Sequence, residues 1–449
     1  MNAQTEIQNT TQIEIQETTQ IESQYTSFQD ILSEANLDTL FDKYNVEDKR
    51  KRKLGVRSFF WMMIFSATQP SFRGSILHLI GFFLGVQTIL CPEAEVDTLS
   101  KMAVSKRLSE MNWYLFRGVY NHLLGKYYDI LDSKEMKYLD YFKEAFAVDS
   151  SVFALGKEME KIFESVHKGK SSLKMHARFS IKTGALDKMQ ITEGKRHDSR
   201  FSFVTKVPNQ LYLVDLGYWS YALMNKIMKA GSFFVMRLKS SCDPQIIAVA
   251  QQEYAHFIGK RLSEIRDYLN EHTSIGQLDL TVKLSQAKNP LMKKPVRLVG
   301  LVHEEQWRFY VTNITDVKFT PDLIYRLYAQ RWQVELFFNF IKNVLNLEKI
   351  ISRTKNGIMI EIYSALIFYL LTQIIIALAA QKVECSIHAF SFERAYKLIS
   401  GFLPSHFHLF FQGAWDKIDQ IFQHCISLVA HMGFSHRKPD TLDIHERFA

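Results

Sequence analysis

The spacing of apolar residues changes along the chain, and the change predicts where helices give way to strands. Between Ser27 and about Tyr138, apolar residues recur every three or four positions, which is the period of a helix with one buried face. Segments 27–44, 58–67 and 117–131 carry this pattern most clearly. The first third of the chain is therefore predicted to be helical.

A different period begins near Phe146, where apolar and polar residues alternate. In the run from Lys174 to Ile181 every second residue is apolar, and this alternation is typical of a half-buried strand. Residues 189–193 indicate another strand, and strand-like patterns recur between residues 240 and 320. The middle of the chain is therefore predicted to form a sheet.

Two short apolar runs in this region are each followed by an aspartate. Ala145–Val148 precedes Asp149, and Leu211–Val214 precedes Asp215. A short apolar run followed by polar or turn residues indicates a buried strand. Each strand is therefore expected to place a carboxylate at its C-terminal end.

A long helix is predicted to follow the strand-rich region. Thr320 suits the N-cap and Pro321 the first helical position, so the helix would begin about four turns before Glu335. Its polar residues follow the spacing Y-x2-R-x3-E-x6-K, which consists of Tyr328, Arg331, Glu335 and Lys342. At about 100° per residue these four side chains lie within roughly 60° of one another. The opposite side is apolar and includes Val334, Phe337, Ile341, Val344 and Leu345.

The polar side of this helix has two interpretations. Arg331 and Glu335 could form an ordinary i,i+4 ion pair on a solvated helix. However, Glu335 could instead join Asp149 and Asp215 in a site of hard oxygen ligands. Magnesium prefers such ligands and keeps several waters, which leaves room for phosphate oxygens. The two strand-end aspartates favour this second interpretation.

The chain resembles the DDE transposases of bacterial insertion sequences, specifically the IS4-like group. The resemblance rests on the order Asp149, Asp215, Glu335, with the glutamate inside the Y-x2-R-x3-E-x6-K helix, and it spans about residues 146–342. Further matching segments are VDLGYWS around the second aspartate, FFVMRLKSS after it, and KMHARFS and GKRHD before it. The resemblance implies an RNase H-like catalytic core.

The resemblance also implies a mechanism. Asp149, Asp215 and Glu335 would be the catalytic residues and would hold two Mg²⁺ ions, which Mn²⁺ could replace. Tyr328, Arg331 and Lys342 would contact DNA phosphates near the transposon end. The implied partners are double-stranded DNA, in the form of terminal inverted repeats and target DNA, and a second copy of the chain in a synaptic homodimer.

Trp307 lies in the run EEQWRFYVTN, ahead of the motif helix. In relatives that open transposon ends through a DNA hairpin, a tryptophan at a comparable place holds a flipped base. Packing inside the strand-rich region is the alternative. Trp307 is accordingly a candidate DNA-binding residue, and the excision route stays open.

These patterns together predict an α/β (α+β) chain in which an RNase H-like core is interrupted by a β-rich insertion and flanked by helical regions. The expected divisions are a disordered tail (1–25), a helical N-terminal DNA-binding domain (26–140), the first segment of the RNase H-like core (141–240), the insertion (241–318), the second segment of the core (319–384) and a C-terminal helical region (385–449).

Composition and charge agree with a nucleic-acid partner. The 449 residues have a formal net charge of +8, and the first 25 contain four glutamates and no Lys or Arg, so the remainder is at +12. A basic run, residues 49–53, could contact phosphates or be a solvated face. The four cysteines lack the spacing of a zinc site and are expected to be reduced.

Cellular location is expected to be cytoplasmic, because the N-terminus lacks the basic and apolar segments of a signal peptide. Residues 362–380 are almost wholly apolar and borderline in length for a membrane span. A helix buried beneath the catalytic sheet is the preferred interpretation, and no membrane association is expected.

Two alternatives to an active transposase are a catalytically inactive, transposase-derived DNA-binding protein and a nuclease built on the same scaffold. An inactive descendant would be expected to lose an acidic position, whereas Asp149, Asp215 and Glu335 are all present. The sequence therefore favours the active enzyme.

Overall fold

A single mixed sheet forms the centre of the computed structural model, which describes residues 27–49, 53–68, 75–90, 98–131, 139, 141–284, 292 and 294–435. The tail 1–25 and residues 50–52 of the basic run lie outside the described residues. Within the described residues the sheet has nine strands in the order β3-β2-β1-β4-β5-β9-β8-β7-β6. The strands are β1 (Glu144–Leu155), β2 (Ser171–Ser180), β3 (Leu186–Glu193), β4 (Gln210–Val214), β5 (Phe233–Arg237), β6 (Gln245–Val249), β7 (Gln277–Lys283), β8 (Val296–His303) and β9 (Gln306–Thr312).

The pairing directions divide the sheet into two regions. Strands β3, β2 and β1 are antiparallel, whereas β1, β4 and β5 run parallel to one another. From β5 onward, β9, β8, β7 and β6 are antiparallel again. The chain is thus a mixed α/β protein, as predicted. The strands of the segment predicted as an insertion do not form a separate sheet, because β9 pairs directly with β5 through Met236 and Val311.

Strand β2 is buried on both faces, so the prediction of a half-buried strand was wrong. Its apolar residues pack with the helical part of the protein, and its polar residues lie under the segment 198–205. The polar side chains are buried because each has a partner. The imidazole of His176 lies 3.2 Å from the Tyr218 hydroxyl, and Arg178 Nε donates to Asp187 Oδ2 at 2.6 Å. Alternation in the sequence cannot distinguish a polar face exposed to water from a buried polar face whose side chains have hydrogen-bond partners.

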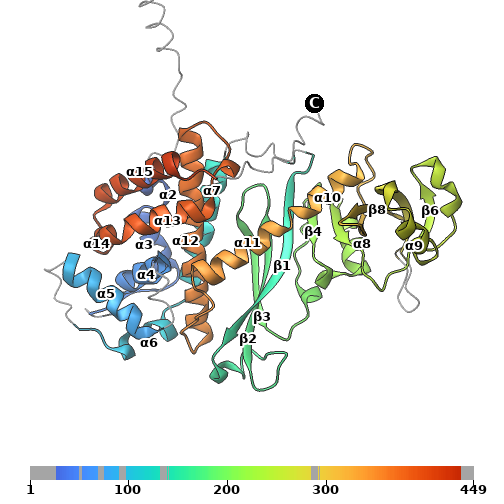
Figure 1. The fold of residues 1–449 in the computed structure, drawn as a ribbon. Coiled ribbons are helices and arrows are strands. Elements are labelled where there is room, and N and C mark those ends of the chain that lie inside the picture. Colours follow the sequence, from blue (N-terminus) through green and yellow to red (C-terminus); the bar gives the residue numbers. More distant parts are fainter. Residues whose placement is uncertain are drawn as a thin grey trace, which may run out of the picture.

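Helices from both ends of the chain form a bundle at one side of the sheet, and Figure 1 shows them side by side in it. The helices are α2 (Phe28–Ile31), α3 (Glu34–Lys43), α4 (Val56–Phe65), α5 (Ile76–Leu90), α6 (Lys101–Glu110), α7 (Tyr114–Ile130), α12 (Lys355–Lys382), α13 (Phe392–Phe402), α14 (Phe407–Gln412) and α15 (Trp415–Met432). The predicted helix over 27–44 is interrupted, because Ser33 caps α3 by accepting a hydrogen bond from Asn36 N.

Aromatic contacts join the two ends of the chain within this bundle. Phe28 of α2 stacks on Trp415 of α15, with ring centroids 6.4 Å apart, and Trp61 of α4 lies 5.0 Å from Phe410 of α14. Gln29 also donates to Asp419 at 2.8 Å. The helical segments predicted at the N-terminus and the C-terminus therefore share one hydrophobic core.

Helix α12 is the one candidate membrane span among the described helices, with a mean hydropathy of 2.1 in its most apolar window. All of that window is buried inside the protein. Its main neighbours are the helices α4, α7, α13 and α15 rather than the sheet. It meets the sheet at the β2–β3 turn, where the Tyr369 hydroxyl donates to Gly184 O at 2.7 Å. Its place differs from the expected one beneath the sheet because α11 (Trp332–Asn339) covers that face, with Phe337 packed 5.3 Å from Phe179.

Candidate active site

Asp149 and Asp215 lie at the point where the parallel region of the sheet ends. The pairing between β1 and β4 stops at Val148 and Val214, and each aspartate is the next residue. Asp149 is not at a strand end as predicted, because β1 continues to Leu155 by pairing with β2 alone. Asp215 caps the short 3-10 helix Leu216–Tyr218. Adjacent strands thus place the two aspartates at the same level of the sheet.

The motif helix is less regular than predicted. Thr320 is the N-cap as expected, with its hydroxyl accepting from Leu323 N at 3.3 Å. The helix is divided into α10 (Pro321–Ala329) and α11, and a π-helical turn (Phe340–Val344) follows. The junction between α10 and α11 is tightened by i→i+3 hydrogen bonds, including Arg331 N to Tyr328 O at 3.0 Å. The local sequence predicts the start of the helix but not this change of winding.

Arg331 connects the helix to the sheet. Its guanidinium donates to Asp149 Oδ2 at 3.2 Å and also pairs with Glu335 on the next turn of α11. The Arg331 side chain is only 13% exposed, so these bonds lie in a partly dry environment where charge–charge interactions are strong. The pair of Arg331 and Glu335 is therefore not the solvated surface pair considered from the sequence.

The electrostatics of Asp149 reflect its neighbours. The pKa of Asp149 is raised from 3.8 to about 6, mainly by burial and also by the charges of Asp215 and Glu335. The Ser150 N–H, which donates to Asp149 Oδ1 at 2.7 Å, and the Arg331 charge act in the opposite direction. The three predicted carboxylates are thus close enough to influence one another. A carboxylate with a raised pKa in this setting is typical of a functional site.

Tyr328 and Lys342 take different places around the carboxylates. Tyr328 packs against Tyr310 of β9, with ring centroids 5.1 Å apart, and Arg331 lies 5.7 Å from its ring centre. Burial is the main reason that the pKa of Tyr328 rises to about 12. Lys342 lies 4.9 Å from the ring centre of Phe153, and burial lowers its pKa. Phe153 is four residues beyond Asp149 on β1, about 13 Å along the strand.

The carboxylates suit a divalent metal, although they do not form a ready-made cluster. In the part of the chain that the structure describes, no three Asp, Glu, His or Cys side chains are arranged as metal ligands. Arg331 lies between Asp149 and Glu335 and supplies the positive charge that holds them together. The donor set consists of hard oxygens, and a cation would offset both the burial of the charge on Asp149 and the repulsion from Asp215 and Glu335. The chemistry of these residues therefore suits a divalent cation.

Trp307 lines a cleft on the far side of β5. Its indole N–H donates to Leu269 O at 2.7 Å, and its ring stacks on Phe309. The cleft has a volume of about 360 Å³ and is lined by one carboxylate, Glu305, and four cations, namely Arg237, Lys239, Arg266 and Arg308. We call it the basic cleft. Arg237 follows Met236, the register partner of Val214, so the cleft begins one strand away from Asp215.

Three polar side chains next to the carboxylates had no role assigned from the sequence, namely Asp198, Ser150 and Lys174. Asp198 Oδ1 accepts from Ser150 Oγ at 2.8 Å and from Lys174 Nζ at 3.1 Å. Asp198 belongs to the GKRHD segment, which was noticed only as a matching segment. Its signal in the sequence is weak because the contact with Ser150 spans 48 residues.

The chain is similar to insertion-sequence transposases. A family model described as "Transposase DDE domain" matches residues 140–371, which is more than half of the chain. The transposase for insertion sequence element IS1151 of Clostridium perfringens is 22% identical over 315 residues, covering 62% of this chain and 66% of that protein. The transposase for element IS231F of Bacillus thuringiensis subsp. israelensis is 22% identical over 361 residues, covering 71% and 72%.

A solved structure with an overall likeness is the piggyBac transposase synaptic complex with hairpin DNA. The TM-score is 0.45 at 8% identity, with 95% of this chain and 89% of that chain covered. The family assignment rests on the family model together with the named relatives, which are consistent with the IS4-like group. The chain therefore belongs to the DDE transposase family, among transposases of bacterial insertion sequences.

Proposed function

We propose that this chain is the active transposase of an IS4-like insertion sequence. It binds the terminal inverted repeats of its element, cleaves the DNA at the element ends and joins the 3′-hydroxyl ends to target DNA. The observation that carries this proposal is that Asp149 of β1 and Glu335 of α11 meet on Arg331, while Asp215 after β4 is near enough for its charge to raise the pKa of Asp149. Carboxylates at these places serve phosphodiester chemistry and have no evident purpose in a protein that only binds DNA.

DDE transposases generally use a divalent metal ion. Two Mg²⁺ or Mn²⁺ ions bound by Asp149, Asp215 and Glu335 would activate the attacking oxygen and stabilise the leaving oxygen. Both hydrolysis and strand transfer are nucleophilic displacements at phosphorus, so one site can serve both steps. No Ser or Cys nucleophile is required.

In this proposal Arg331 and Tyr328 bind the DNA backbone near the scissile phosphate. The guanidinium of Arg331 can offer two parallel N–H groups to a phosphate once a metal neutralises Asp149 and Glu335. The Tyr328 phenol keeps its proton at physiological pH, because its pKa is about 12, and can donate a hydrogen bond. Lys342, which lies over Phe153 farther along β1, would contact a neighbouring phosphate as a point charge.

The basic cleft extends this surface away from the carboxylates. Its four cations suit the phosphates of a DNA strand that leaves the site toward β9. Trp307 could stack an unpaired base at the edge of the cleft, although its N–H is already bonded to Leu269 O, which also suits a packing role. We propose that the protein acts as a homodimer on cytoplasmic DNA, so that two element ends are processed together.

The test is a cleavage assay on labelled DNA that carries the repeats flanking the gene, with Mg²⁺ present. Glu335→Ala is expected to lower cleavage about a thousandfold or more, because a metal site contributes several kcal/mol to the transition state. End binding should survive in this variant. Asp322→Ala is the matched control, since it removes an acid from α10 that pairs with Arg326 at the surface. It should cleave like the parent.

Other outcomes of this assay would point to the alternatives. If the parent protein binds the repeats and never cuts them, the chain is a binding protein derived from a transposase. If Glu335→Ala loses binding and cleavage equally, Glu335 has a structural role. Hairpin ends among the products would support the base-stacking role of Trp307, whereas open 3′-hydroxyl ends would favour its packing role.

A further inference from the structure

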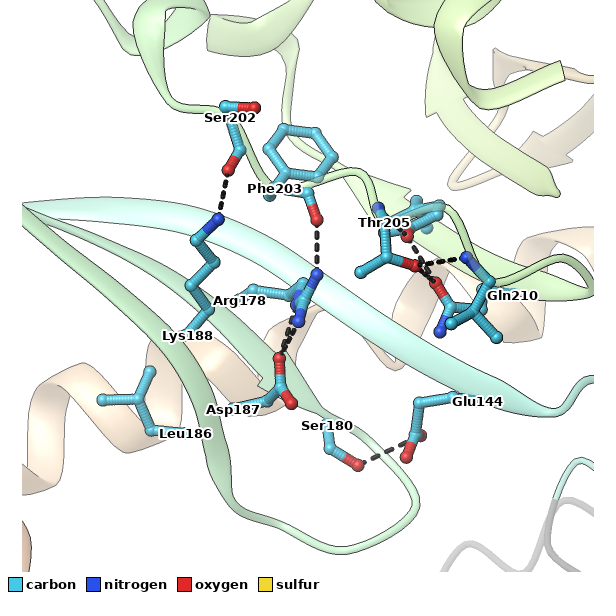
Figure 2. Close-up of polar contacts among 12 residues, drawn as sticks. Glu144, Arg178, Ser180, Leu186, Asp187, Lys188, Ser202, Phe203, Thr205 and Gln210 are labelled. Carbon is cyan, nitrogen blue, oxygen red and sulfur yellow. Dashed lines mark hydrogen bonds and ion pairs between the residues drawn. The ribbon is translucent and has the colours of Figure 1, made fainter. Parts of the chain in front are cut away.

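A strap of residues 198–205 crosses the face of the sheet opposite α11. Figure 2 shows how it is fastened: Arg178 donates to Phe203 O, Lys188 donates to Ser202 O at 2.8 Å, and Thr205 bonds to Gln210 at 2.6 Å. Phe201 adds a stacking contact with His176, with ring centroids 5.3 Å apart. The strap is thus attached to β2, β3 and β4, and its first residue, Asp198, is placed by these contacts.

Asp198 reaches the residue that follows Asp149. Its Oδ1 accepts from the Ser150 hydroxyl at 2.8 Å, and the Ser150 N–H donates in turn to Asp149 Oδ1 at 2.7 Å. The side chain of Lys174 adds a donor to the same Asp198 oxygen at 3.1 Å and balances its charge. Asp198 therefore acts as a hydrogen-bond acceptor that fixes Ser150, and through Ser150 the orientation of Asp149.

Asp198 also touches the turn that holds Asp215. Asp215 Oδ2 accepts from Gly217 N at 3.1 Å. A Cβ atom on Gly217 would lie 3.0 Å from Asp198 Oδ2 and 3.6 Å from Asp215 Oδ2, so both carboxylates approach the same glycine. A residue with a Cβ atom at this position would require the Asp198 carboxylate to shift by a few tenths of an ångström. One side chain therefore contacts the segments that carry two of the three candidate metal ligands.

We propose that Asp198 is a positioning residue that sets the placement of Asp149 relative to Asp215 and thereby the affinity of the site for divalent cations. This inference rests on the proposed function, because it takes the two aspartates to be metal ligands. Groups that orient metal ligands typically change metal affinity about 10- to 100-fold when they are removed. Asp198 itself does not bind the metal in this proposal, since Ser150 and Lys174 already occupy its Oδ1 oxygen.

The test measures Mn²⁺ binding to the full-length protein directly, from the electron paramagnetic resonance signal of free Mn²⁺. Asp198→Ala is expected to weaken binding about tenfold or more. Asp198→Asn keeps an oxygen that can accept from Ser150 and should restore most of the affinity. Gly217→Ala should also weaken binding, because its methyl group displaces the Asp198 carboxylate.

Asp279→Asn is the matched control. Asp279 of β7 is also an aspartate paired with a cation of the neighbouring strand, in this case Arg297 of β8, whose other hydrogen bonds go to Ile314 O and Asp316 O, outside the strap. It should leave Mn²⁺ affinity unchanged even if it lowers stability. Unchanged affinity in folded Asp198→Ala would overturn the proposal. If that variant does not fold, Ser150→Ala decides, because it removes the same hydrogen bond without leaving a charge unpaired.

Asp149→Asn separates this inference from the proposed function. If Asp149→Asn does not weaken Mn²⁺ binding, the carboxylates are not a metal site and the proposed function loses its basis. If Asp149→Asn weakens binding and Asp198→Ala does not, only the positioning role of Asp198 fails.

Discussion

The charge on Asp149 lowers the stability of the folded protein. It lies in a strand that is otherwise fully buried at residues 145–148, and its side chain is 18% exposed. Burial disfavours its charge, and two further carboxylates add repulsion. Arg331 offsets only part of this effect, because the pKa of Asp149 remains raised. A residue kept ionised in such a place is better explained by function than by folding.

The pH dependence of stability follows from this shift. Because the pKa of Asp149 rises from 3.8 unfolded to about 6 folded, the folded state holds the proton more tightly. The resulting stabilisation is fully present below about pH 4 and is lost as the pH rises through about 6. Asp149→Asn, which is neutral throughout, should therefore be more stable than the parent at pH 7.5 without metal. The gain should be at most about 3 kcal/mol, from about 1.4 kcal/mol for each pKa unit.

Urea unfolding in EDTA at pH 7.5 and pH 4 measures this difference. The advantage of Asp149→Asn should shrink at the lower pH. A variant less stable than the parent at pH 7.5 would mean that the ion pair with Arg331 outweighs the burial of the charge.

At the scale of elements, the helix that carries Glu335 combines strong local signals with a long-range adjustment. Thr320 and Pro321 begin it where the sequence predicts. The tight junction at Arg331 and the π-helical turn after Asn339 change the winding on either side of Glu335. Such π segments are often found at functional sites. Lys342 belongs to the π-helical turn and lies over the ring of Phe153 of β1.

The cap of this helix supports a stability prediction. Thr320→Ala should lower the free energy of unfolding by about 1 kcal/mol, because it removes the acceptor for Leu323 N. Thr320→Ser keeps the hydroxyl and should be nearly neutral. Chemical denaturation of the two variants beside the parent provides the measurement, and equal losses in both would show that the threonine methyl group matters rather than the cap.

For the whole molecule, charge and shape together favour DNA as the binding partner. The chain is basic overall, and four cations gather in the cleft that begins one strand from Asp215. The bundle joins helices from both ends of the chain, so the predicted N-terminal DNA-binding domain is packed against the C-terminal region through contacts such as Phe28 with Trp415. Truncation of either end would therefore expose part of a shared core.

Salt dependence tests the cleft as a DNA-binding surface. Arg266→Ala should weaken binding of the repeat DNA and reduce the slope of log K against log salt by about one, as expected for the loss of one phosphate contact. Lys397→Ala is the control, since Lys397 is exposed and paired with Glu393 on α13. DNA titrations at several salt concentrations provide the measurement. If both variants keep the slope of the parent, the cleft is not a DNA-binding surface.

Much of the fold and of the candidate site follows from local sequence. Apolar runs predict the strands before Asp149 and Asp215, and the cap at Thr320 predicts the start of the motif helix, because strand burial and capping involve neighbouring residues. The same patterns identify Asp149, Asp215, Glu335 and Arg331 as candidates, and whether they catalyse the reaction remains a prediction.

The tertiary structure alone decided what depends on distant contacts. The burial of His176 and Arg178 required partners elsewhere in the chain, which periodicity cannot reveal. The pairing of β9 with β5 extended the core sheet, and packing between the two ends of the chain formed one bundle. Asp198 reached Ser150 across 48 residues because the strap holds it there. Local propensity determines which elements form, whereas burial and hydrogen-bond satisfaction determine which of them meet.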